Sequence, residues 1–504
     1  MPEVVADTTT GRVAGSPAEG VLVFRGVPFA RPPVGSLRFR PPQPAEPWAG
    51  VRDARAEGPI AMQTPSPLET VFSDRPPGTS EDCLTLNVWT PALDGARRPV
   101  LVWIHGGSFL TGSGSTPWYD GASFARRHDV VVVTVNYRLG AFGFLHLADL
   151  GGEAYASSGN AGLLDQVAAL RWVRDNIAAF GGDPQLVTAF GESAGAMSIG
   201  NLLALPAAAG LFGRAILQSG AASTVVTAEQ ATTVTRELLA ALGLGWRPAD
   251  LLRLHDVPAT ELLAAQGTVA LRAGIAGLAF APVVDGTTLA AHPLEAVAAG
   301  SAEGVDLLIG TNRDEMRLFV MLDPSLGVVD EAALALRADE LFGRQGGRLA
   351  IATYRAGRPA GGPGDVWSAM LSDRVFRVPA VRLAERHRQA GSNTYMYLFT
   401  WATPAFGGAL GSCHALEIPF VFNRLDAPAV AMFTGPPTPE ARRLSMAMHD
   451  AWAAFARAGD PGHAGLPPWP PYDEVDRRTM VLGPEPHVEA DPLGDERRLW
   501  ATVD

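Results

Sequence analysis

Short, continuous runs of apolar residues recur along the chain, and longer amphipathic stretches separate them. In residues 161–180 the apolar side chains recur at three- and four-residue steps, which predicts a helix that ends at Gly181 and Gly182. Strands that alternate with helices predict an α/β fold whose mostly parallel central sheet has helices on both faces. Six runs have the length and apolar composition of strands buried on both faces: residues 99–104, 130–135, 185–190, 214–217, 305–309 and 394–398.

Two regions depart from this alternation. Residues 222–300 and 325–390 are richer in Gly, Pro and Ala and predict helical insertions that cap the sheet. The tail, residues 458–504, is dense in proline and is expected to wrap over the surface. Because no repeat, charge run or long low-complexity linker divides the chain, we predict a single domain over residues 1–504.

The bulk composition narrows the possible classes of protein. Of 504 residues, 47% are hydrophobic and 18% are charged, an ordinary balance for a globular protein. The formal net charge of -12 disfavours nucleic acid as a partner, because phosphates would be repelled. The 40 residues counted as Lys or Arg are all Arg, which excludes enzymes that use a lysine nucleophile or a Ser-Lys pair.

The cysteines and the distribution of apolar segments bear on where the protein is located. Cys83 and Cys413 cannot form a disulfide framework for so long a chain, so reduced thiols are expected, with one bridge between them as the alternative. Residues 1–7 lack the basic and apolar regions of a signal peptide, and no run of about 18 apolar residues is present. We therefore expect a cytoplasmic monomer that has no membrane partner, cofactor or metal.

The strongest chemical signal is the pentapeptide G-E-S-A-G at residues 191–195. It matches G-x-S-x-G, and it lies between a predicted strand and a helix-compatible stretch, which is the context of a nucleophile elbow. The sharp turn needs small neighbours, and Gly191, Ala194 and Gly195 supply them. The alternative is a chance match in a chain with 55 glycines, and the strand–turn–helix context argues against it. Ser193 is therefore the candidate nucleophile.

A second signal is the H-G-G-S-F loop at residues 105–109, directly after the strand predicted at 99–104. Loops of this kind supply N–H groups to an oxyanion hole upstream of a nucleophile elbow. We predict that the amides of Gly107, Ser108 and Ala194 form the hole. An ordinary glycine-rich turn at a strand end is the alternative.

Taken together, these motifs and several other segments resemble the type-B carboxylesterase family, which includes cholinesterases and bacterial para-nitrobenzyl esterases. The resemblance implies the α/β-hydrolase fold and a carboxylic-ester hydrolase of broad substrate range. The resembling segments follow one another in the family's order: residues 24–44, 80–91, 100–109, 135–144, 159–184, 187–196, 310–315, 413–422 and 459–472.

The base and the acid follow the nucleophile in this fold. Sequence alone does not choose between Asp314 and Glu315, which both lie beyond the strand predicted at 305–309, and the resemblance selects Glu315. It likewise selects His414, in the segment C-H-A-L-E-I-P-F-V-F. Seven histidines follow Ser193: His255, His292, His387, His414, His449, His463 and His487.

The resemblance implies a Ser193–His414–Glu315 triad that forms an acyl-enzyme with a small-molecule ester. Activity is then expected to fall on acidification through about pH 6–7, near the ordinary pKa of histidine. The resemblance also makes Glu192, which precedes the nucleophile, a candidate to assist the reaction. It makes Ser219 a candidate to hydrogen-bond the acid of the triad. For both residues, a role in packing alone is the alternative.

Two departures from the family bear on its chemistry. Secreted relatives pair the cysteine of S-E-D-C-L with an earlier one, but Met62 stands at that place, so Cys83 is expected to be a buried free thiol. Residues 66–80 contain no Trp before S-E-D-C, so choline specificity is not expected.

Two other functions are also compatible with this sequence. The same triad could hydrolyse carbamates or amides, and the sequence does not separate these from esters. A non-catalytic, cholinesterase-like binding protein is the other alternative, and the presence of all three triad residues argues against it.

Overall fold

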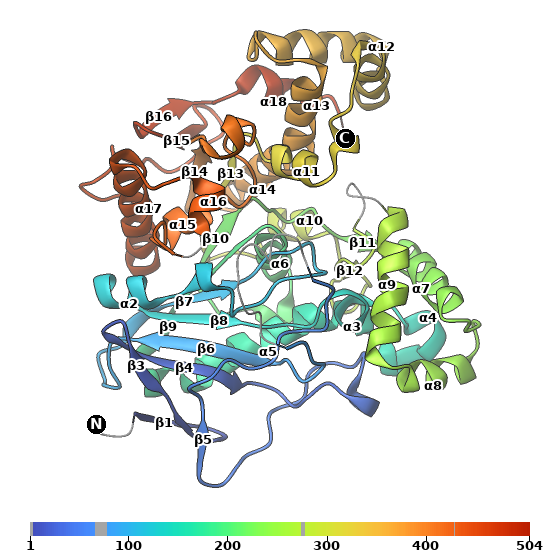
Figure 1. Ribbon diagram of the computed structural model, residues 1–504, viewed down its shortest axis with the longest axis vertical. Coiled ribbons are helices and arrows are strands. Elements are labelled where there is room, and N and C mark those ends of the chain that lie inside the picture. The colour runs from blue at the N-terminus through green and yellow to red at the C-terminus, as the bar shows by residue number, and fades with distance from the viewer. Residues whose placement is uncertain (1–3, 66–77, 274–277, 428, 504) are drawn as a thin grey trace.

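A twisted sheet of eleven strands runs through the molecule, as the computed structural model shows (Figure 1). The structure describes residues 4–65, 78–273, 278–427 and 429–503. From one edge to the other, the strands are β16 (His487–Ala490), β15 (Arg478–Leu482), β14 (Thr394–Phe399), β13 (Asp306–Asn312), β10 (Arg214–Gln218), β9 (Gly182–Glu192), β7 (Arg98–Ile104), β8 (Val131–Val135), β6 (Thr85–Thr90), β4 (Val21–Pro28) and β3 (Ser16–Ala18).

The seven strands from β15 to β8 are parallel, and the outer strands at both edges are antiparallel. All six predicted strands lie in the parallel part, with ends that differ by a few residues. The antiparallel edge that contains β4 and β6 was not predicted. The mostly parallel sheet agrees with the predicted fold.

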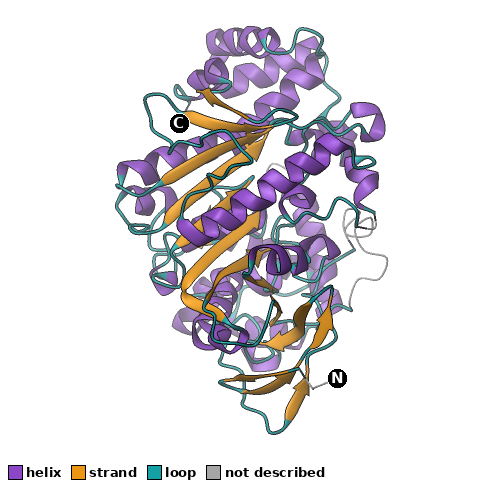
Figure 2. Cartoon of the chain, turned by 90° about the vertical axis from the view of Figure 1, so that its left-hand side faces the viewer, coloured by secondary structure: helices purple, strands orange, loops and turns teal. Residues whose placement is uncertain are grey.

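Each central strand sends alternate side chains to opposite faces of the sheet. In β7, Val102 and Ile104 join a core under one face, whereas Leu101 and Trp103 join a core under the other. Because both faces are covered, every residue of β7 is buried, which explains the uninterrupted apolar sequence after Arg98. Helices α5 (Ala161–Asn176), α6 (Ala194–Leu202) and α14 (Val378–Gln389) cover the first face, and α2 (Ala122–His128) and α17 (Pro439–Ala458) cover the second (Figure 2).

Both regions predicted as insertions are helical. In Figure 1 the first extends beside the sheet and α12 and α13 lie beyond its end. The second has a small core of its own, which includes Leu334, Tyr354 and Met370. The first region contains β11 (Val226–Thr227), α7 (Ala228–Ala241), α8 (Pro248–Asp256), α9 (Ala259–Ala273), β12 (Val283–Val284) and α10 (Pro293–Ala298); the second contains α12 (Glu331–Ala356), α13 (Pro363–Ser372), a π-helical turn labelled η8 (Asp373–Arg377) and α14.

Short elements connect these layers. A separate three-stranded sheet joins β1 (Val5–Thr8), β2 (Gly11–Ala14) and β5 (Val51–Asp53). In the part of the chain that the structure describes, no helix is long and apolar enough to cross a membrane. The remaining helices are η1 (Gly35–Leu37), η2 (Pro117–Tyr119), α3 (Gly140–Phe144), α4 (Ala148–Gly151), η3 (Gly152–Tyr155), η4 (Ser158–Asn160), η5 (Ile177–Phe180), η6 (Pro206–Ala208), α11 (Met316–Leu322), η7 (Pro324–Leu326), η9 (Ala405–Gly408), α15 (Ile418–Val421), α16 (Val430–Thr434) and α18 (Gly494–Trp500).

The C-terminal tail is part of the fold and not a surface wrap, so this prediction was wrong beyond residue 477. Strand β15 pairs with β14 in parallel register and β16 closes the edge. Leu482 on β15 and Trp500 on α18 are both buried. Proline obscured the strand because the proline-rich segment comes just before it.

We expect Leu482→Ala to lower the free energy of unfolding by about 2–5 kcal/mol, because Leu482 is fully buried and the change leaves a cavity. Val475→Ala, at a side chain that is 88% exposed in the same tail, should change it by less than about 0.5 kcal/mol. Denaturant unfolding of both variants measures the difference. Equal, small effects would mean that the tail is not packed into the sheet.

Candidate active site

Ser193 occupies a strained turn between β9, which ends at Glu192, and α6, which begins at Ala194. Its backbone angles are φ 54 and ψ -125, a region that L residues rarely adopt. The turn packs against the end of β7 so closely that a Cβ on Gly195 would lie 1.9 Å from the carbonyl oxygen of Ile104, and one on Gly191 2.5 Å from it. Both glycines are therefore required by space, and the strand–turn–helix geometry predicted for the elbow is present.

The loop after β7 lies directly against this turn. A Cβ on Gly106 would approach the Cβ of Ser193 to 3.0 Å. Gly107 and Ser108 have φ values of 111 and 56, so the loop backbone turns sharply here. Among the described residues, the N–H groups of Gly107, Ser108 and Ala194 have no hydrogen-bond acceptor. The arrangement thus holds unused amides beside Ser193, as an oxyanion hole requires.

Folding brings His414 and Glu315 together across 99 residues of sequence. His414 Nδ1 lies 2.6 Å from Glu315 Oε2, and both side chains are buried. The N–H of Asn312, at the end of β13, donates to Glu315 Oε1 at 2.8 Å and fixes the carboxylate. A short contact of Nδ1 with a carboxylate leaves the other imidazole nitrogen available as a base.

His414 Nε2 faces Glu192, the neighbour of Ser193 in sequence. The distance from Nε2 to Glu192 Oε1 is 3.1 Å. Among the described residues, no hydrogen bond joins Ser193 Oγ to the imidazole. The structure therefore gathers Ser193, His414 and Glu315 in one place, with Nε2 directed at Glu192 and not at Ser193 Oγ.

The alternatives to Glu315 and His414 lie elsewhere. Asp314 faces the guanidinium groups of Arg313 and Arg317 and accepts the N–H of Ser412. Among the other histidines, His387 contacts Thr394 and His449 contacts the carbonyl of Val421. Geometry thus separates candidates that sequence order alone left open.

A third buried carboxylate, Glu417, was missed by the sequence reasoning. Its oxygens accept hydrogen bonds from Gln218 at 3.0 Å and from Asn312 at 2.6 Å. Burial raises its pKa, and the charge of Glu315 raises it further. Its position three residues after His414 was the available signal, but an isolated glutamate before an apolar run does not reveal burial.

The charges around His414 change its acid–base behaviour. Burial opposes the imidazolium, but the charges of Glu192 and Glu315 outweigh burial and raise the pKa of His414 above its usual range. Burial also raises the pKa of Glu192, against the attraction of His414. The two groups therefore compete for a proton near neutral pH, so the activity loss expected at pH 6–7 is displaced to higher pH.

Aromatic rings form one wall beside the imidazole. The rings of Phe319 and Phe376 lie 5.1 and 4.7 Å from the ring of His414. Phe109, in the loop after β7, is fully buried and packs on Phe144, so it belongs to the core.

Several secondary expectations have mixed outcomes. Ser219 Oγ is buried and finds no partner among the described residues, so the predicted hydrogen bond to the acid is absent.

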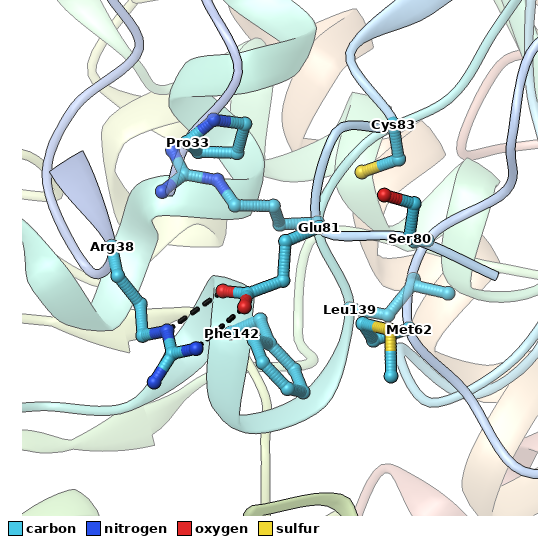
Figure 3. A pocket seen from close by; sticks show the side chains of 10 residues that line it. Pro33, Arg38, Met62, Ser80, Glu81, Cys83, Leu139 and Phe142 are labelled. Atoms are coloured by element: carbon cyan, nitrogen blue, oxygen red, sulfur yellow. Dashed lines mark hydrogen bonds and ion pairs between the residues drawn. The ribbon is translucent and has the colours of Figure 1, made fainter. Parts of the chain in front are cut away.

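Cys83 and Cys413 are both free and buried. Figure 3 shows Cys83 and Met62 lining one small cavity, beside the ion pair between Arg38 and Glu81.

The prediction against choline specificity rests on residues 66–80. Most of this segment, residues 66–77, lies outside the described residues. Within the described ranges, no group of three or more His, Cys, Asp or Glu side chains could hold a metal ion.

The fold and this arrangement of residues define a class, the serine hydrolases of the α/β-hydrolase fold. The model of the carboxylesterase family matches residues 2–500, and the chain belongs to this family. It is 43% identical to a para-nitrobenzyl esterase of Bacillus subtilis (strain 168), over 99% of this chain and 98% of that one. It is 40% identical to a phenmedipham hydrolase of Pseudarthrobacter oxydans, over 95% of each chain.

Solved structures agree with these relatives. A carboxylesterase of Geobacillus stearothermophilus superposes with a TM-score of 0.89 at 47% identity, over 99% of this chain and 100% of that one. A thermophilic PNB esterase gives a TM-score of 0.88 at 40% identity, with 99% of both chains covered. The predicted family, the α/β-hydrolase fold and the enzyme class, a carboxylic-ester hydrolase, are confirmed.

We expect Glu192→Gln to shift the acid limb of kcat/KM toward lower pH by about one pH unit, because it removes a negative charge that stabilises the imidazolium. In the unaltered protein, the pH at which kcat/KM falls to half of its maximum on acidification should lie above about 6.5. A pH–rate profile measures both values. The control is Glu489→Gln, next to the exposed His487, which should leave the profile unchanged. A limb that does not move in Glu192→Gln would contradict the assigned role of this charge.

Proposed function

We propose that this carboxylesterase works through a Ser193–His414–Glu315 triad and an acyl-enzyme intermediate. The observation that carries the proposal is the 2.6 Å contact between His414 and Glu315 next to the strained Ser193 elbow. Hydrolysis by a serine needs a base, a group that orients the base, and donors for the oxyanion. Each of these needs corresponds to a group described above.

In the first half of the reaction, His414 Nε2 takes the proton of Ser193 Oγ as this oxygen attacks the ester carbonyl. Negative charge then develops on the carbonyl oxygen, and the amides of Gly107, Ser108 and Ala194 donate to it. Such donors act best when they are fixed before the reaction, as they are here by the elbow and the loop. The imidazolium gives its proton to the departing alcohol.

In the second half, a water molecule attacks the acyl group on Ser193 and His414 takes its proton. The tetrahedral intermediate collapses, the acid is released and Ser193 regains its proton from His414. Glu315 accepts the Nδ1–H of His414 and holds this tautomer of the base.

The substrate is proposed to be a small ester, and a broad range is inferred from the family. A single domain, a monomer and a cytoplasmic location also stay predictions; the two free thiols support a reducing compartment.

Ser193→Ala should lower the hydrolysis of para-nitrophenyl butyrate by at least about 10³-fold, because the nucleophile is lost while the oxyanion donors remain. Release of para-nitrophenol measures the rate. Ser301→Ala, at an exposed serine, is the matched control and should keep the full rate. Equal rates for Ser193→Ala and the unaltered protein would refute the triad.

A substrate panel separates the remaining alternatives. It pairs esters, carbamates and anilides that share one acyl group, and it includes phenmedipham because one relative is named for hydrolysing it. The proposal expects the esters to be fastest. Faster turnover of carbamates or anilides would favour the alternative function of the same triad.

A further inference from the structure

One short segment contacts the base of the proposed triad and the residue that follows its acid. Ser372 Oγ accepts the N–H of Met316 at 3.0 Å, and Met316 directly follows Glu315. Four residues later, the ring of Phe376 lies 4.7 Å from the ring of His414. Both side chains are buried. Residues 372–376 therefore form a bridge between the chain segment that contains Glu315 and the ring of His414.

The bridge does not continue α13 as an ordinary helix. From Asp373 to Arg377 it is a π-helical turn, in which the N–H of Val378 donates to the carbonyl of Asp373. The extra residue of a π-turn rotates the side chains that follow, and such turns need support from outside the helix. The direction in which Phe376 points thus depends on whatever holds this turn.

A buried network of side chains holds it. Arg377 donates to both oxygens of Asp373, at 2.6 Å each, and Tyr354 donates its hydroxyl to Asp373. Each of these three side chains is at most 5% exposed. The network therefore ties the π-turn to α12 through Tyr354.

Helix α18, the last helix of the chain, completes the network. Trp500 Nε1 donates to the hydroxyl of Tyr354 at 2.8 Å. Glu496 is paired with Arg358, and it lies 3.8 Å from Arg377. Two carboxylates and two guanidinium groups balance each other inside the protein, which makes the loss of any one partner costly to the geometry of the rest.

We propose that the C-terminal helix α18 positions the active site: through Tyr354 and the Asp373–Arg377 pair it locks the π-helical turn that presses Phe376 against His414. This inference rests on the proposed triad. Phe376, Tyr354 and Trp500 are positioning residues, because none of the network side chains beyond Phe376 contacts the triad. The last helix is then needed for turnover as well as for stability.

Tyr354→Phe and Trp500→Phe test the proposal. The first removes the hydroxyl and keeps the ring, and the second removes the indole N–H and keeps an aromatic side chain, although a smaller one. Without the lock, Phe376 moves and the base spends less time aligned with Ser193, so kcat should fall about ten-fold while KM changes less than about two-fold. The matched control is Thr90→Val, which removes a buried hydrogen bond to Phe180 at the opposite ends of the strands and should keep kcat.

A readout at His414 excludes a purely structural role. The ring of Phe376 excludes water from an imidazole that Glu192, Glu315 and Glu417 also face. Less burial favours the cation, so the acid limb of kcat/KM should move to higher pH in Tyr354→Phe and in Phe376→Leu. In the Phe376→Leu background, Tyr354→Phe should have little further effect, because both changes act on one contact.

Histidine NMR in the Ser193→Ala background separates this proposal from the proposed function, because it needs no turnover. The pKa of His414 should rise when Tyr354→Phe is added. A folded Tyr354→Phe and Trp500→Phe with unchanged kcat, pH profile and His414 titration would overturn the proposal, as would full additivity with Phe376→Leu. Equal rates for Ser193→Ala and the unaltered protein, together with a shifted His414 titration, would overturn the triad alone.

Discussion

Three buried carboxylates surround one imidazole in this protein, and their mutual repulsion is the constraint on which the site depends. Removing an ion from water costs several kcal/mol unless it is paired and hydrogen-bonded. Glu315 and Glu192 are compensated by the two nitrogens of His414. Glu417 is compensated by the side-chain amides of Gln218 and Asn312. The two carboxylates stabilise the imidazolium and raise the pKa of His414 above its usual range.

The parallel sheet makes this concentration of charge possible. Glu192, Gln218 and Asn312 are the last residues of β9, β10 and β13, which are neighbours in the sheet. The carboxyl ends of parallel strands meet at one edge, so three positions far apart in sequence supply an acid and two amides to the same place. Ser193 follows the first of these strands and Glu315 the third, so the strands that precede them fix the positions of the proposed nucleophile and acid.

Much of the sheet and most of the proposed site could be predicted because their signals are local. Runs such as residues 99–104 are apolar throughout since both faces are covered, and the elbow needs glycines wherever it occurs. The antiparallel edge and β15 could not be predicted so easily. β4 pairs with β6 and β15 with β14 across long stretches of sequence, and the proline-rich segment before β15 resembles a loop.

The sequence by itself determined the family and the class of enzyme, because the nucleophile-elbow motif and the glycine-rich loop of the proposed site are each tied to a short pattern. Only the tertiary structure decided which further groups act on His414. The burial of Glu417, the contact of Glu192 with Nε2 and the pressure of Phe376 all arise from elements that meet in space. Burial and electrostatic coupling depend on distances across the fold, and a short pattern in the sequence does not contain those distances.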